Sequence, residues 1–139
     1  MDVLVLIGRL LFVPLFLGSA MGHLTQTEGM AAYAKSRGLP SARIAVLGTG
    51  VMLAVGGILV LLGLWADLGA LILVLFLVPT AVLMHAFWRE TDAQVRQNEM
   101  VQFLKDLSLA GAALMLFAFF AYLGDDLGLT ITGPLFDLN

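Results

Sequence analysis

Long apolar stretches alternate with short polar ones along the whole chain. An α-helix needs about 20 mostly apolar residues to cross the hydrocarbon core of a bilayer. Four segments meet that requirement, residues 3–24, 44–66, 68–88 and 101–123. A backbone in lipid must satisfy its own hydrogen bonds, which favours helices over an open sheet. We therefore predict an all-α protein, a single membrane domain of residues 1–139 that forms an antiparallel four-helix transmembrane bundle.

The polar connections indicate how these helices are joined. Only a turn around residues 64–69 separates the second and third spans, which predicts an antiparallel hairpin. A longer connection with a Gly38-Leu39-Pro40 break joins the first two spans. Before the last span, Asp92 opens a run without Pro or Gly and is a candidate N-cap. We therefore expect the last helix to begin in water before it enters lipid.

Composition excludes several classes of protein. Hydrophobic residues make up 60% of the chain and charged residues 12%, against about 45–50% and about 25% in soluble domains. A water-soluble globule is therefore excluded. With no cysteine, disulfides, thiolate chemistry and covalently attached haem are excluded as well. The net charge of −3 provides no basic field for a phosphate backbone, so nucleic acid is not an expected partner.

The charged residues are distributed unequally between the two sides of the predicted bundle. The basic residues in the connections fall on one side: Lys35, Arg37, Arg43, Arg89, Arg96 and Lys105. On the other side the only basic residue is Arg9, which lies inside a span, and the rest are acidic: Asp2, Asp67, Asp125, Asp126 and Asp137. Because basic loops stay in the cytoplasm, we predict that both termini lie outside.

Five short motifs in order resemble the DoxX family of small bacterial membrane proteins. They are RLL at 9–11 with FLGSAMGHL at 16–24, MAAYA at 30–34 with GLP at 38–40, the glycines Gly50, Gly56, Gly57 and Gly63, HAFW at 85–88, and QFLKDL at 102–107. The resemblance implies a multi-pass protein of the bacterial inner membrane. It also implies an association with quinone-linked oxidoreductases, which in this family include a subunit of thiosulfate:quinone oxidoreductase.

Two positions depart from the family pattern. Many members carry a glutamate in the second helix where this chain has Leu53, and Asp106 stands where asparagine is usual. A proton or cation role of that glutamate therefore does not transfer to this chain.

The only two histidines, His23 and His85, end the first and third predicted spans and so fall on the basic side. An imidazole there is suited to relay a proton to a quinone oxygen. The alternative is an interfacial side chain bonded to a loop carbonyl. Helix-end histidines without further ligand spacing do not predict haem b or a metal site. The candidate quinone-binding set also includes side chains near the same boundary, whose aromatic members have interface anchoring as the alternative: Tyr33, Phe87, Trp88 and Lys105.

Arg9 needs a partner, because an unpaired guanidinium inside a span costs roughly 2.5–3.5 kcal/mol on insertion scales. Three acidic residues of the same side are available for a structural ion pair: Asp67, Asp125 and Asp126. The alternative is a cation that binds a quinone carbonyl or a lipid phosphate.

Prolines and glycines add two further expectations. Pro14 and Pro79 each remove a helical hydrogen bond, and a kink at Pro79 beside Thr80 would open a pocket to lipid-soluble ligands. Gly18 and Gly22 form a GxxxG pair, which serves either packing within the bundle or a homodimer.

Together these features predict an auxiliary membrane subunit of a redox complex. Its basic end would receive a quinone, and a soluble oxidoreductase docked on the cytoplasmic loops would supply electrons. The alternative is a structural or assembly protein in the membrane that binds only lipid or partner proteins. No nucleotide-binding, zinc-protease or nucleophile-elbow motif is present.

Overall fold

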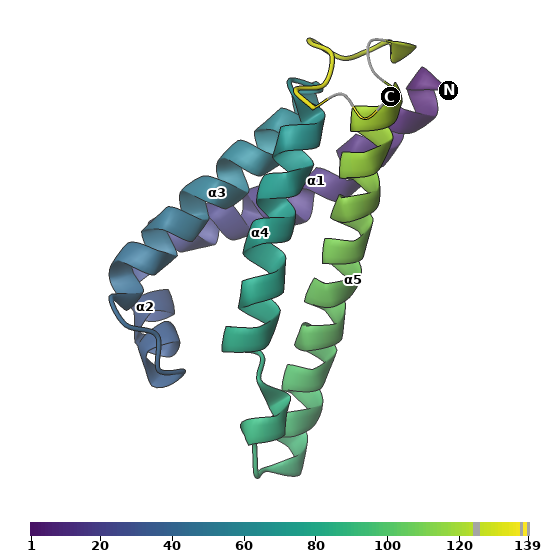
Figure 1. The fold of residues 1–139 in the computed structure, drawn as a ribbon. Coiled ribbons are helices and arrows are strands. Elements are labelled where there is room, and N and C mark those ends of the chain that lie inside the picture. Colours follow the sequence, from purple (N-terminus) through teal and green to yellow (C-terminus); the bar gives the residue numbers. More distant parts are fainter. Residues whose placement is uncertain (124–125, 137, 139) are drawn as a thin grey trace.

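The computed structural model describes residues 1–123, 126–136 and 138. Within them the chain contains helices and no strand, which confirms the predicted all-α class (Figure 1). The elements in chain order are α1 (Asp2–Thr25), α2 (Thr27–Ser36), α3 (Ala42–Leu62), α4 (Ala66–Met84), the 3-10 turn η1 (Phe87–Arg89) and α5 (Ala93–Leu123). Four segments are long and apolar enough to span a membrane, namely α1, α3, α4 together with η1, and α5.

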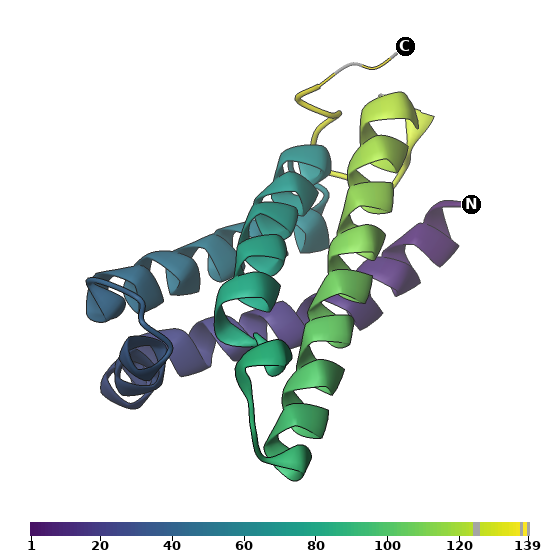
Figure 2. The same ribbon diagram turned by 60° about the horizontal axis from the view of Figure 1, so that its bottom comes forward.

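Both chain ends lie at one end of the bundle, and α2 and the connection from α4 to α5 lie at the other (Figure 1). We call these the terminal end and the basic end. Helix α1 packs on α3, α3 on α4, and α4 on α5. In both Figure 1 and Figure 2 the α1–α3 pair and the α4–α5 pair diverge towards the basic end. The predicted basic residues are therefore gathered around the open end of a splayed bundle.

Glycines bring α3 and α4 together near their connecting turn. A Cβ added to Gly69 would lie 2.9 Å from the Gly56 carbonyl oxygen, so the two backbones touch there. Gly18 meets no other segment within 4 Å, and a Cβ on Gly22 would meet only the tip of Met30. Close packing inside the described chain therefore uses Gly56 and Gly69 rather than the GxxxG pair, and a homodimer through that pair stays a prediction.

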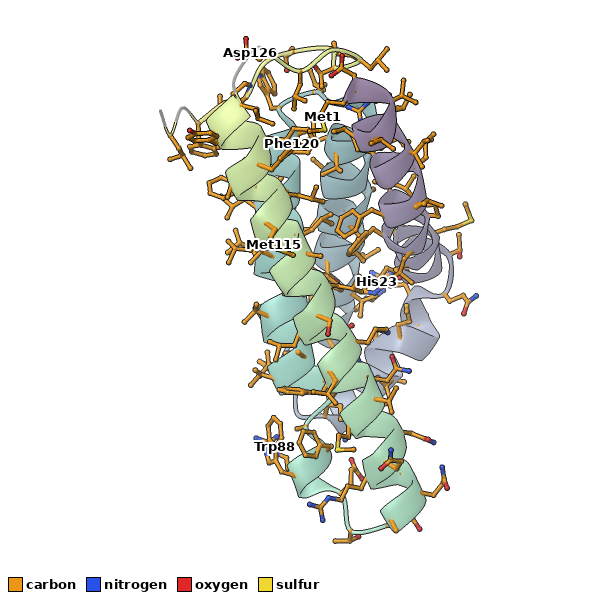
Figure 3. The ribbon with its side chains drawn as sticks, turned by 90° about the vertical axis from the view of Figure 1, so that its right-hand side faces the viewer. Met1, His23, Trp88, Met115, Phe120 and Asp126 are labelled. Carbon is orange, nitrogen blue, oxygen red and sulfur yellow. The ribbon has the colours of Figure 1, made fainter. Side chains whose placement is uncertain are left out.

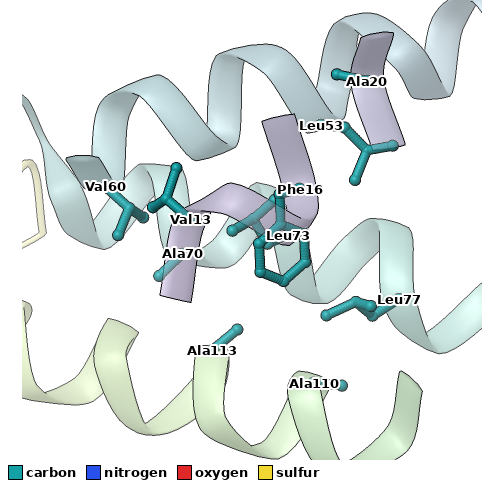
Figure 4. Close-up of a cluster of buried hydrophobic side chains, with 10 residues drawn as sticks. All are labelled: Val13, Phe16, Ala20, Leu53, Val60, Ala70, Leu73, Leu77, Ala110 and Ala113. Atoms are coloured by element: carbon teal, nitrogen blue, oxygen red, sulfur yellow. The ribbon is translucent and has the colours of Figure 1, made fainter. Parts of the chain in front are cut away.

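A single apolar cluster fills the centre of the bundle (Figure 4). Phe16 on α1 and Leu73 on α4 are among its largest fully buried side chains. Helix α5 contributes two small residues, Ala110 and Ala113. Small side chains on α5 leave room for the larger ones of α1, so the four helices share one core although α1 and α5 are not close neighbours.

Among the described residues of the terminal end, Arg9 forms no ion pair. Arg9 is only 2% exposed and donates from Nη2 to the Leu129 carbonyl oxygen at 2.5 Å. Asp67 is fully buried, and its Oδ2 accepts from the amides of Leu135 and Phe136 at 2.8 and 2.7 Å. Among the described residues the two charges form no ion pair with each other, so the prediction is wrong for Asp67.

The chain after α5 contacts both charges with backbone groups, while Arg9 Nε and Nη1 and Asp67 Oδ1 have no hydrogen-bond partner among the described residues. Its backbone offers a carbonyl to the cation and amides to the anion. Of the other two predicted partners, Asp126 is exposed and Asp125 lies outside the described residues.

Further backbone bonds hold this terminal segment over the turn between α3 and α4. The amides of Ile131 and Thr132 donate to the Gly63 carbonyl oxygen at 2.9 and 3.1 Å, and the Trp65 amide donates to Thr132 Oγ1 at 2.8 Å. Gly63 has a φ of 64°, and a Cβ there would lie 2.9 Å from Thr130 Cα. Only glycine fits this position without strain.

The basic end differs from the predicted boundaries in two ways. Helix α4 ends at Met84, four residues before the predicted end of its span, and η1 then reverses the chain. Helix α2 was not predicted; its Ala31 and Ala34 are buried against Ala42 and Val46 of α3. The Asp92 prediction is confirmed, because its Oδ1 accepts from the Val95 amide at 2.9 Å where α5 begins.

Candidate functional site

A cavity of about 530 Å³ lies where α3 and α4 diverge, with α1 and α2 completing its wall. Most of the lining is apolar, from residues such as Met30, Met52, Phe76 and Leu83. The polar side chains in the wall are few: His23, Gln26, Tyr33, Thr49, Thr80 and His85. An apolar cavity of this size with a few polar groups is typical of a small-molecule site.

The cavity opens sideways, towards the lipid. Leu75 and Leu83 line it and are 59% and 48% exposed. Both belong to α4, within a segment long and apolar enough to cross the membrane. A ligand that is dissolved in the bilayer can therefore reach the cavity between the helices without passing through water.

His23 lies in the cavity wall and is held there through its Nδ1. Its Nδ1 lies 3.1 Å from the Val46 carbonyl oxygen and 3.0 Å from Thr49 Oγ1. The Thr49 hydroxyl donates its own proton to the Ala45 carbonyl oxygen at 2.8 Å. Because both partners of Nδ1 act as acceptors, we assign the proton of the neutral imidazole to Nδ1. Nε2 then carries a lone pair, and among the described residues it has no hydrogen-bond partner.

The cavity wall also includes the part of α4 around its internal proline, Pro79. Pro79 has no N–H, so the Leu75 carbonyl oxygen receives no helical hydrogen bond from that position. The next residue, Thr80, also lines the cavity. No hydrogen bond of its hydroxyl is found within the described part of the chain. Pro79 and Thr80 therefore both border the cavity, and the kink at Pro79 stays a prediction.

His85 lies where α4 unwinds, and it connects the cavity wall to α5. Its Nδ1 is 2.8 Å from Glu99 Oε2, and its Nε2 is 3.6 Å from Asp106 Oδ2. The two acids are about two helical turns apart and so share one face of α5. Because a carboxylate accepts, Nδ1 donates to Glu99, and Nε2 is the ring nitrogen near Asp106.

A charged network at the basic end holds Glu99 in place. Arg37 of α2 donates from Nη2 to Glu99 Oε1 at 2.7 Å and pairs through Nη1 with Glu90. The Tyr33 hydroxyl, 3.1 Å from the same Glu99 oxygen, also accepts from the guanidinium of Arg37. The network thus joins α2, the connection after η1, and α5 around His85.

Two groups of this network, outside the membrane spans, have displaced pKa values. Burial raises the pKa of the Tyr33 phenol above its ordinary value of 10.0. Burial alone would lower the pKa of Arg37, but its bonds to Glu90 and Tyr33 outweigh that effect and raise it. At neutral pH the phenol is therefore a hydrogen-bond donor and the guanidinium a permanent cation.

The structure brings together only part of the predicted quinone-binding set. His23, His85 and Tyr33 all line the cavity. Phe87 and Trp88 instead form an edge-to-face cluster with Phe103, with ring centroids 5.2–5.7 Å apart. Figure 3 shows Trp88 well apart from His23, at the basic end.

Lys105 also lies away from the cavity. Its Nζ is 2.5 Å from Gln102 Oε1 and 3.6 Å from Asp106 Oδ1, all on α5. No residue of α5 is part of the cavity wall in the described chain. The prediction placed these side chains by membrane depth alone, and depth does not determine which way a side chain points.

Sequence reasoning missed Glu99 as the partner of His85. The available signal was the spacing of Glu99 and Asp106, which places two acids on one helix face. Nothing in the sequence shows that His85 of another helix lies against that face. Across the described residues no group of three or more acidic or histidine side chains could hold a metal ion.

Apolar helices around a cavity that opens sideways define a multi-pass membrane protein of the helical-bundle class. The family model for DoxX matches residues 4–86, and the chain belongs to the DoxX family. The match includes every residue that lines the cavity.

One curated relative identifies the kind of membrane. The chain is similar to Inner membrane protein YphA of Escherichia coli (strain K12), with 32% identity over 114 residues, 82% of this chain and 81% of that protein. No solved structure matches the chain. The similarity and the apolar spans make this chain a multi-pass inner membrane protein.

Proposed function

We propose that the chain is an auxiliary subunit of a membrane redox complex, and that its cavity binds the head group of a quinone or quinol. The observation that carries the proposal is the apolar cavity open to lipid, with His23 in its wall and no partner for His23 Nε2 among the described residues. Quinones are dissolved in the bilayer and are bound through the two carbonyl oxygens of a largely apolar ring, which suits a cavity with few polar groups.

The polar groups of the wall suit the reduced form in particular. A quinol hydroxyl is a donor, and His23 Nε2, which has no hydrogen-bond partner in the described chain, can accept it. The Thr80 hydroxyl can donate to a quinone carbonyl or accept from a quinol. The site can therefore form hydrogen bonds with both the quinone and the quinol. Because few polar groups line the cavity, the free-energy cost of leaving them unpaired is modest.

The basic end supports the second part of the proposal, docking of a soluble oxidoreductase. The positive-inside rule directs this end to the cytoplasm and both termini outside. Arg37 is committed to the network around Glu99, but Lys35, Arg89 and Arg96 are exposed and form no ion pair within the described chain. These side chains are available to attract an acidic partner.

Binding of short-chain quinones tests the proposal directly. Calorimetry of the protein in nanodiscs would measure the affinity for ubiquinol-1 and ubiquinone-1. Ala45→Phe fills the cavity and should weaken both affinities by at least about tenfold. Ala118→Phe, the same substitution at an exposed position of α5, is the matched control and should leave both unchanged.

His23→Leu should weaken ubiquinol-1 binding about fivefold through the lost acceptor, with a smaller effect on ubiquinone-1. Equal affinities for wild type, Ala45→Phe and Ala118→Phe would refute the proposal. Retention of phospholipid in place of quinone, detected by native mass spectrometry, would favour the structural and lipid-binding alternative.

A further inference from the structure

Asp106 is a buried carboxylate that lacks the usual means of stabilising a charge. Its side chain is 8% exposed, and in the described chain it makes no hydrogen bond. The two nearest basic side chains are both 3.6 Å away, His85 Nε2 at Oδ2 and Lys105 Nζ at Oδ1. A buried carboxylate with such long contacts is stabilised by a proton nearby, on itself or on its neighbour.

The charges around His85 favour a shared proton. Three acids, Glu90, Glu99 and Asp106, are opposed by two bases, Arg37 and Lys105. The formal sum is −1, so one proton on the His85–Asp106 pair brings the network to zero. Tyr33 stays neutral, and His23 lies across the cavity with neutral partners.

We infer that His85 and Asp106 form a proton-holding pair, through which the cavity exchanges one proton with water at the basic end. Nδ1 of His85 is committed to Glu99, so Nε2 serves the exchange. When a quinol hydroxyl donates to Nε2, the proton already held there leaves. It passes to Asp106 and then to water beside Lys105, whose side chain is 46% exposed.

This inference rests on the proposed quinol site, and it couples quinol binding to the release of a proton. No electron moves in it: the N–H bond at Nε2 breaks, and an O–H bond forms on Asp106. In this step His85 would contact the ligand. Asp106 would not contact the ligand and would act through His85, as a positioning residue.

Calorimetry in buffers with different heats of ionisation counts the protons released when ubiquinol-1 binds. At pH 6 the wild type should release a measurable fraction of a proton, and Asp106→Asn should lose most of that release. At a pH high enough that neither protein releases a proton on binding, both should bind with affinities within about twofold, which shows that the variant is folded. Glu28→Gln, at an exposed acid that pairs with Arg43 away from the cavity, is the matched control.

Lys105→Met provides a second variant at an exposed position. Without the cation of Lys105, the His85–Asp106 pair holds its proton more tightly. Proton release on ubiquinol-1 binding should therefore extend to higher pH. Equal proton release from wild type and Asp106→Asn, with ubiquinol-1 bound, would overturn the inference and leave the proposed function standing. Absence of ubiquinol-1 binding to the wild type would overturn both.

Discussion

Arg9 and Asp67 at the terminal end are buried as deeply as any charged side chain at the basic end, yet their partners differ in kind. At the terminal end the partners are backbone groups of Leu129, Leu135 and Phe136. At the basic end, charged side chains pair with one another around His85.

This difference in partners distinguishes buried charges that hold the structure together from buried charges that can take part in proton exchange. Backbone amides and carbonyls do not titrate, so their bonds to Arg9 and Asp67 fix the terminal segment in one position. Side-chain partners can gain and lose protons and can be rearranged by a ligand. The cavity of about 530 Å³ borders the basic end, and our proposal places the chemistry of the molecule there.

The largest expected effect on stability is at the terminal end. Asp67→Ala leaves the amides of Leu135 and Phe136 buried without an acceptor and should lower the free energy of unfolding by about 3 kcal/mol. Unfolding in mixed micelles measures the loss, and limited proteolysis would show the terminal segment released. Asp67→Asn retains an accepting oxygen and should cost only about 1 kcal/mol. Equal costs for the two variants would mean that the charge, rather than the acceptor, matters.

At the basic end Arg37→Gln should lower the free energy of unfolding by about 2 kcal/mol at pH 8, because Glu90 and Glu99 lose their shared cation. The cost should shrink only as the pH falls below the ordinary pKa of a carboxyl, about 4.3, since a protonated carboxyl does not need the cation. The pKa of Arg37 is raised, so the wild type keeps this charge over the whole range. Unfolding measured at several pH values tests the prediction, and a cost independent of pH would contradict the titrating character of this end.

The smallest effect is expected from Tyr33→Phe, which removes one hydroxyl from the network. The loss should be about 0.5 kcal/mol, typical of a partly exposed hydrogen bond. Because the pKa of Tyr33 is raised above 10.0, the phenol stays protonated and the loss should be the same from pH 5 to pH 9. A pH-dependent loss, seen in the same unfolding experiment, would show that Tyr33 itself takes part in proton exchange.

Much of the fold could be predicted from the sequence, because lipid imposes simple rules. Apolar length predicted four spans, and the positions of Lys and Arg predicted a basic end. Asp92 predicted the water-exposed start of α5. Helix α2 could not be predicted, since its stability comes from Ala31 and Ala34 packing on α3, a contact between helices.

The candidate site was only partly predictable for the same reason. The end positions of His23 and His85 predicted that they share one side of the bundle, and both line the cavity. Their partners could not be predicted: Glu99 lies on another helix, and the carbonyl of Val46 leaves no pattern in side-chain types. The partners of Arg9 were missed likewise, because they are backbone groups.

The length of α5 has an electrical consequence. Its 31 residues extend about 46 Å at 1.5 Å per residue, more than the roughly 30 Å of hydrocarbon in a bilayer. Counting about 20 residues back from Leu123 reaches Phe103, so Asp106 lies within about one turn of the boundary and Glu99 beyond it. A proton that joins or leaves at this depth crosses little of the transmembrane voltage, and its exchange should therefore depend on bulk acidity rather than on membrane potential.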